Sequence, residues 1–128
     1  MNGPTRFLLD EHLRGPLFDA IGLHNALPDA EPLIAFRVGD FPDLPLGVDD
    51  RAILRWAERE GCILLTSDQA TMASHFRDHL AAGGHSPGIF FVPKVFSLPV
   101  ILDCLVLAAH VAVPSEWLDR RVYLPALA

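Results

Sequence analysis

The sequence predicts an α/β fold built around a mostly parallel sheet, because short apolar runs alternate along the chain with segments of helical spacing. Two of these runs, 62–66 (CILLT) and 88–92 (GIFFV), contain almost only apolar residues. Such runs are typical of parallel strands that are buried on both faces. The 128 residues are enough for one domain with a substantial core, and we expect a single domain over 1–128.

Each predicted strand is a short apolar segment bounded by turn-forming or charged residues. The expected strands are 6–9 (RFLL), 33–38 (LIAFRV), 62–66, 88–92 and, at the sheet edge, 121–124. The sheet should therefore have four to five strands. Since helices are expected between them, the connections should be right-handed crossovers.

Helices are predicted at 13–23, 50–60, 70–82 and 98–111. The helix 50–60 has the clearest signals. Asp49 or Asp50 can cap its start, its apolar residues recur at three- and four-residue spacing, and Gly61 follows its last turn. Proline-rich loops are expected at about 25–32 and 39–47, and the C-terminal part, 97–124, should hold a helix and the edge strand.

Composition limits the class of protein. Ten Lys and Arg against sixteen Asp and Glu give a net charge of −6, which argues against broad electrostatic binding to nucleic acid but leaves room for a local basic groove. Cys62 and Cys104 lie in apolar runs, as expected for buried thiols in a reducing compartment. The first residues lack the pattern of a signal peptide, and the apolar stretch 98–113 is interrupted by polar residues. We expect a soluble cytoplasmic protein with no membrane association.

Carboxylates directly follow two of the predicted strands. Asp10 and Glu11 follow 6–9, and Asp68 closes the segment after 62–66. The carboxyl ends of parallel strands share one edge, where ligands bind, so these acids converge if the two strands are neighbours. Oxygen ligands of this kind suit Mg²⁺ or Mn²⁺, and such a site can support hydrolysis of a phosphodiester.

Neighbouring polar residues have both a functional and a structural interpretation. Asp49 and Asp50 join the acids if their helix starts near the same edge, but either can simply cap that helix. Glu11 can face the site, or it can face solvent or cap a helix. Thr66 and Ser67 can orient ligands through their hydroxyls, or they can form a turn.

Four segments form an ordered set of motifs along the chain: 6–12 (RFLLDEH), 50–57 (DRAILRWA), 63–68 (ILLTSD) and 87–92 (PGIFFV). In this order they resemble the PIN-like family of small prokaryotic proteins related to the VapC-type toxin ribonucleases. The resemblance implies a three-layer α/β/α sandwich and a Mg²⁺- or Mn²⁺-dependent endoribonuclease, the toxin of a toxin–antitoxin pair. It assigns Asp10, Asp50 and Asp68 as catalytic acids and metal ligands, with Glu11 as a further ligand.

The sequence departs from the family pattern at two positions. His12 replaces the usual asparagine, and Ala70 stands where the family often carries another acid. Asp78 or Glu11 is a candidate substitute for that acid in space. Because a lost ligand weakens metal binding, the alternative is a weak or inactive module that acts by binding an antitoxin or a second copy of itself.

Arginines at four-residue spacing on the predicted helix 50–60 suggest an RNA contact. Arg51, Arg55 and Arg59 would share one helix face and could contact phosphates. The structural interpretation is a solvated face on which Arg55 pairs with Glu58.

Three further interpretations have less support. His75, His79 and His85 suggest a zinc site, but no metalloprotease motif accompanies them. Asp68, with Lys94 beyond the next strand, suggests a receiver-like phospho-acceptor domain. Cys62 fits a core position better than a nucleophile.

Overall fold

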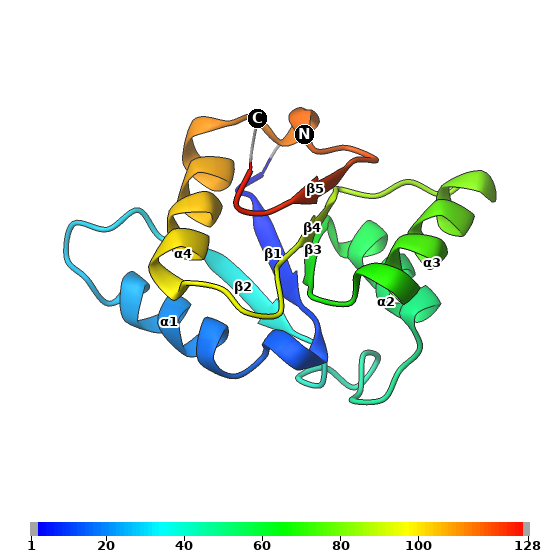
Figure 1. The fold of residues 1–128 in the computed structure, drawn as a ribbon, viewed down its shortest axis with the longest axis horizontal. Coiled ribbons are helices and arrows are strands. Elements are labelled where there is room, and N and C mark those ends of the chain that lie inside the picture. The colour runs from blue at the N-terminus through cyan, green and yellow to red at the C-terminus, as the bar shows by residue number, and fades with distance from the viewer. Residues whose placement is uncertain (1–2, 127–128) are drawn as a thin grey trace.

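The computed structural model describes residues 3–126, which form one five-stranded parallel sheet with helices on both faces (Figure 1). The strands are β1 (Arg6–Leu9), β2 (Ile34–Arg37), β3 (Cys62–Thr66), β4 (Ile89–Phe91) and β5 (Arg121–Tyr123). Their order across the sheet is β2-β1-β3-β4-β5, and every neighbouring pair is parallel.

The α-helices of the described residues are α1 (Pro16–Asn25), α2 (Asp50–Glu60), α3 (Gln69–Ala81) and α4 (Leu98–Val106). One core lies between the sheet and the pair α1 and α4, and the other lies between the sheet and the pair α2 and α3 (Figure 1). These three layers confirm the predicted α/β class. The sheet has five strands, in agreement with the predicted four to five.

The central strands bury side chains on both faces. In β1, Phe7 and Leu9 belong to the core under α1 and α4, whereas Leu8 belongs to the core under α2 and α3. Phe90 of β4 packs against Phe7 and Trp117, with ring centroids 6.3 and 5.3 Å apart. This double burial explains why the strand sequences are continuously apolar rather than alternating.

Helix α2 begins and ends where the sequence predicts. The Asp49 side chain accepts a hydrogen bond of 2.8 Å from the backbone N–H of Ala52, which caps the helix. Gly61 ends it with φ of 72°, a left-handed conformation that glycine adopts without steric cost.

Helix α3 is shifted by one residue from its predicted bounds, and two other helices differ from theirs by more. The segment predicted as a helix from residue 13 begins with a 3-10 turn, Glu11–Leu13, and α1 starts only at Pro16 because Gly15-Pro16 interrupts the chain. The last predicted helix ends as α4 at Val106 and continues as a π-helical turn over Leu107–Val111. Within residues 3–126, no helix is long and apolar enough to cross a bilayer.

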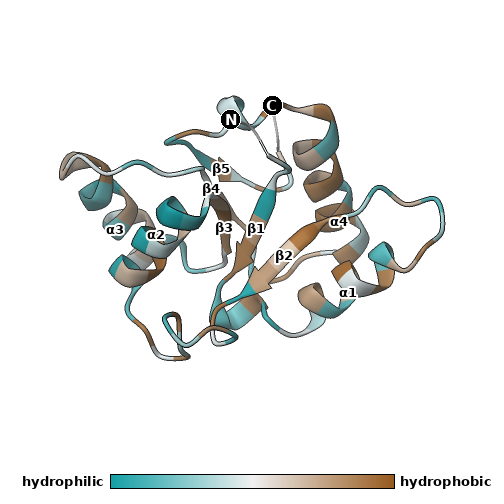
Figure 2. Ribbon diagram, turned by 180° about the vertical axis from the view of Figure 1, so that it is seen from behind, coloured by the Kyte–Doolittle hydropathy of each residue, from teal (hydrophilic) through white to brown (hydrophobic). Residues whose placement is uncertain are grey.

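The helices of the two faces differ in surface chemistry. Figure 2 shows α4 mostly in the hydrophobic colour and α2 largely in the hydrophilic one. Helix α2 is therefore a richer source of polar and charged side chains than α4.

Candidate functional site at the carboxyl edge of the sheet

Strands β1 and β3 are direct neighbours, as the convergence of their terminal acids requires. Leu9 is paired in register with Leu65, and the backbone N–H of Asp10 donates to the Leu65 carbonyl at 3.0 Å. Asp10 therefore extends the β1–β3 pairing by one residue and lies at the carboxyl edge of the sheet.

Asp10 is a buried carboxylate with two protein donors. Its side chain is held between the Thr66 hydroxyl, which donates to Oδ2 at 2.8 Å, and the Glu11 backbone N–H, which donates to Oδ1 at 2.8 Å. Asp10 is 6% exposed and Thr66 is fully buried. A buried charge requires such partners, and they fix the orientation of the carboxylate.

Thr66 connects Asp10 to Asp68. Its Oγ1 also accepts a hydrogen bond of 3.1 Å from the backbone N–H of Asp68. The Asp68 side chain in turn accepts from the Thr71 N–H at 3.2 Å and caps α3. The sequence suggested that the Thr66 hydroxyl orients a ligand or forms a turn. In the structure this hydroxyl orients the carboxylate of Asp10.

The two acids at the start of α2 have different surroundings. Asp49 caps the helix, whereas Asp50 is partly buried, with Oδ2 3.9 Å from Nε2 of His75. Burial raises the pKa of Asp50, and the negative charges of Asp10, Asp68 and Asp49 raise it further, while His75 lowers it. Asp50 is therefore the α2 acid that shares the electrostatic environment of Asp10 and Asp68.

The two candidate substitutes for an acid at Ala70 have different surroundings. Glu11 is partly buried, and its carboxylate accepts a hydrogen bond from the backbone N–H of Gly47. Asp78 lies ten residues beyond Asp68, or about 15 Å along the axis of α3, and lines a different pocket. Asp78 is thus remote from Asp68 along α3, whereas Glu11 stays a candidate ligand.

A pocket of about 380 Å³ lies beside Asp68 and Ser67. His12 and Lys94 also line it, and Lys94 lines a second pocket of about 330 Å³ with Ser67 and Asp68. Neither His12 nor Lys94 was predicted for an acidic metal site. Both residues follow a strand closely, His12 after β1 and Lys94 after β4. Because the carboxyl ends of parallel strands share one edge, these positions could have indicated both residues from the sequence.

The donor set fits a hard divalent cation that keeps several waters. Within residues 3–126, no three His, Cys, Asp or Glu side chains lie close enough to form a ready-made metal-binding group. Mg²⁺, however, is commonly held by one or two carboxylates together with waters and substrate phosphates. Each oxygen of Asp10 retains a lone pair beyond its single protein donor, so the carboxylate can still accept a metal.

The histidines and Cys62 are engaged in other ways. His79 Nε2 donates to Glu58 Oε1 at 2.7 Å and to the His85 carbonyl at 2.9 Å, so this nitrogen supports local structure rather than a zinc site. Glu58 also accepts from the His85 N–H, and the predicted pair between Arg55 and Glu58 is replaced by these contacts. Burial raises the pKa of Cys62 to about 11, which leaves little nucleophilic thiolate at neutral pH.

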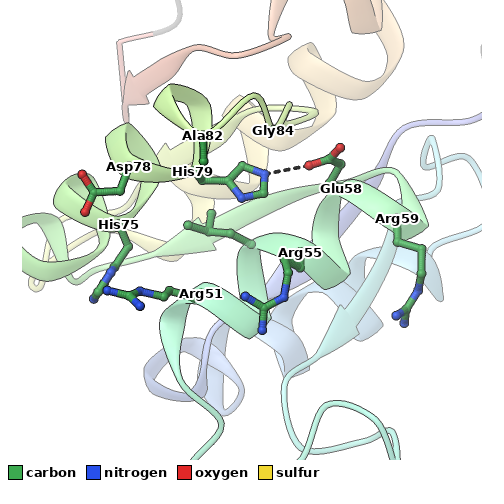
Figure 3. Close-up of a pocket in the computed structure, with 10 residues that line it drawn as sticks. Arg51, Arg55, Glu58, Arg59, His75, Asp78, His79, Ala82 and Gly84 are labelled. Atoms are coloured by element: carbon green, nitrogen blue, oxygen red, sulfur yellow. Dashed lines mark hydrogen bonds and ion pairs between the residues drawn. The ribbon is translucent and has the colours of Figure 1, made fainter.

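The arginines of α2 lie apart from the carboxylates of the sheet edge. Arg51, Arg55 and Arg59 line a pocket between α2 and α3 (Figure 3). The structure thus brings Asp10, Asp50, Asp68, Thr66 and Ser67 to one region, and places the arginines on an adjoining surface.

Comparisons of the chain with protein-family models, with curated proteins and with solved structures found no match. The functional argument therefore depends on the residues of the site itself.

Proposed function

We propose that the protein is a divalent-metal-dependent ribonuclease in which Asp10, Asp50 and Asp68 hold Mg²⁺ or Mn²⁺. The observation that carries this proposal is that Asp10, just after β1, and Asp68, just after β3, are both bonded to the Thr66 hydroxyl at the carboxyl edge of the sheet, with Asp50 of α2 near enough for its charge to interact with both. Like charges brought together in this way are typical of functional sites, where a bound cation offsets their repulsion.

The surrounding residues support this chemistry by orienting the acids and the substrate. Thr66 holds Asp10 in one orientation and also fixes the N–H of Asp68, so both acids depend on one hydroxyl. Lys94 lies beside Asp68 in the adjoining pocket, where an ammonium group can bind a substrate phosphate. A bound Mg²⁺ or Mn²⁺ would supply an activated water and stabilise charge on the phosphodiester during displacement.

The acids available to the metal are few. Among the described residues, no three potential ligands form a ready-made group, and Ala70 offers no ligand. We therefore expect weak metal binding and slow cleavage, with substrate phosphates completing the coordination.

A cleavage assay with a charge-matched control tests the proposal. The full-length protein is incubated with 5′-labelled single-stranded RNA in Mn²⁺, Mg²⁺ or EDTA, and Mn²⁺ binding is measured by calorimetry. We expect metal-dependent cleavage that Asp68→Asn lowers by about 100-fold or more, since the ligand is lost. Asparagine is also a good N-cap, so α3 should remain folded in this variant.

Asp19→Asn is the control, because it removes the same charge from an exposed position on α1, away from the acids and from the pockets described. It should retain wild-type cleavage. Activity that survives in EDTA or in Asp68→Asn would refute the nuclease assignment. A folded wild-type protein that neither binds Mn²⁺ nor cleaves RNA would favour the non-catalytic binding module.

The toxin role adds a protein partner to the proposal. Apolar side chains are exposed on α4 and the π-helical turn, at Val100, Leu107 and Val111, with exposed fractions of 44%, 48% and 72%. Exposed apolar surface of this kind supports contact with an antitoxin or a second copy of the chain. Size-exclusion chromatography with light scattering, alone and after co-expression with genes adjacent to this one, would detect either complex.

One observation favours a second candidate, a receiver-like phospho-acceptor domain. The strand order β2-β1-β3-β4-β5 is the flavodoxin-like order that receiver domains share, and Asp68 follows β3. Against it, Pro93 stands where a receiver needs a hydroxyl after β4. Stable labelling of Asp68 by acetyl phosphate, with no RNA cleavage, would replace the first proposal with this one.

A further inference from the structure

The pocket between α2 and α3 is larger than those beside Asp68. Its volume is about 640 Å³, within the range of sites that hold organic ligands. Figure 3 shows arginines extending from α2 on one side and His75 and His79 from α3 on the other. Leu54 and Ala82 add apolar surface to the walls.

The charges that line this pocket are unevenly paired. Arg59 binds Asp43 at 2.6 Å and Glu60 at 2.9 Å, and Glu58 accepts hydrogen bonds from His79 and from the backbone of His85. These contacts satisfy the pocket residues at the end of α2.

Arg51 and Arg55 are different. Within residues 3–126, neither forms a hydrogen bond or an ion pair, and both are exposed on successive turns of α2. Two neighbouring guanidinium groups without partners create a local positive surface on a chain whose net charge is −6.

His75 provides an independent indication of a ligand. Its Nδ1 is buried and makes no hydrogen bond among the described residues, and its Nε2 lies 3.9 Å from Asp50, beyond hydrogen-bond distance. A buried polar atom without a partner is costly, and native structures rarely retain one without a reason. His75 lines the pocket, so an imidazole with an unsatisfied nitrogen forms part of the pocket wall.

We propose that this pocket binds a nucleotide, with Arg51 and Arg55 as ligands of its phosphate and His75 as a further donor. The planar guanidinium group matches phosphate in a bidentate geometry. The volume exceeds that needed for inorganic phosphate and leaves room for a ribose and a base, which can stack on arginine or histidine side chains. The bound nucleotide is either a free mononucleotide or one nucleotide of an RNA strand.

The proposed pocket does not depend on the ribonuclease proposal. If both hold, the contact between His75 and Asp50 places the bound phosphate next to the acid cluster. If the protein does not cleave RNA, the pocket should still bind nucleotide.

Binding measurements on the full-length protein test the pocket. Calorimetry uses AMP, adenosine and inorganic phosphate, and fluorescence anisotropy uses labelled hexauridylate. We expect saturable binding of AMP that is at least tenfold tighter than that of adenosine or phosphate alone. Hexauridylate that binds much more tightly than AMP would identify RNA as the source, and equal affinities would identify the free nucleotide.

Matched variants separate this pocket from general charge effects. Arg51→Ala with Arg55→Ala should weaken binding at least tenfold. For hexauridylate it should lower the slope of log affinity against log salt by about 1.4, since each single-strand phosphate contact contributes about 0.7. The control is Arg77→Ala with Arg121→Ala, which removes the same charge from exposed positions outside the pocket.

His75→Phe should weaken binding several-fold, because the proposed donor is lost. Binding is measured in EDTA, so that a metal held by the acids does not contribute to it. Equal affinities in the two double variants, or no AMP or RNA binding by the wild type at millimolar concentration, would overturn the proposal.

Discussion

The two faces of the sheet are covered by helices of opposite character. Helix α4 has a single charged residue, Asp103, whereas six of the eleven residues of α2 are charged. The core under α1 and α4 contains Phe90 and Trp117, and the opposite layer holds the pocket of arginines and histidines. One face thus contributes mainly packing, and the other combines packing with the groups that can bind ligands.

The largest effect is expected on the packing face. Phe90→Ala removes a fully buried ring that contacts Phe7 and Trp117, and it should lower the free energy of unfolding by about 3–5 kcal/mol. Arg55→Ala, on the exposed surface of α2, should change it by less than about 0.5 kcal/mol. Urea unfolding followed by circular dichroism measures both. Similar losses in the two variants would contradict this division between the faces.

A smaller loss of stability is expected at the carboxyl edge of the sheet. Asp10→Ala leaves the Thr66 hydroxyl and the Glu11 N–H without their acceptor, which should cost about 2–4 kcal/mol. Asp10→Asn keeps the size and an acceptor oxygen, and should cost less. Urea unfolding of both variants and of Thr66→Val in a double-mutant cycle would measure the coupling. Additive effects of Asp10→Ala and Thr66→Val would show that the hydrogen bond contributes little.

A still smaller change, and a gain in stability instead of a loss, is expected at Asp50. The raised pKa of Asp50 means that its charged form is disfavoured in the folded state, so stability is lost as the pH rises through the folded pKa. In EDTA at pH 7, Asp50→Asn should therefore raise the free energy of unfolding by about 0.5–1 kcal/mol. The gain should disappear below the unperturbed pKa of 3.8, where the acid is protonated in both states.

Thermal melts across this pH range measure the effect of Asp50→Asn. Added Mn²⁺ should raise the midpoint of the wild type more than that of the variant, because binding to the folded state stabilises it. A variant less stable than the wild type in EDTA at pH 7 would show that the carboxylates do not repel one another.

Local signals allowed much of the fold to be predicted. Strands β1 and β3 and helix α2 have their predicted bounds, because an acid or a glycine ends each apolar pattern. The sequence also located Asp10 and Asp68 at strand ends. It did not establish that β1 and β3 are adjacent, since that depends on how the crossovers pack.

Interactions between distant residues account for what the sequence could not predict. Thr66 donates a hydrogen bond to Asp10, which lies 56 residues away in the sequence. Glu58 bonds to His79, 21 residues away, instead of to its expected partner Arg55. The place of His75 beside Asp50 likewise depends on α2 packing against α3. The π-helical turn after α4 carried no sequence signal that distinguished it from a regular helix.

Two of the three clustered acids lie at helix starts: Asp50 in the first turn of α2, and Asp68 as the N-cap of α3. Each helix start carries roughly half a positive charge from its aligned peptide dipoles. That fixed charge moderates the repulsion among the acids before any cation arrives. In the proposed nuclease, the chain would therefore not need the metal in order to fold, and the cation would bind to acids that are already in place.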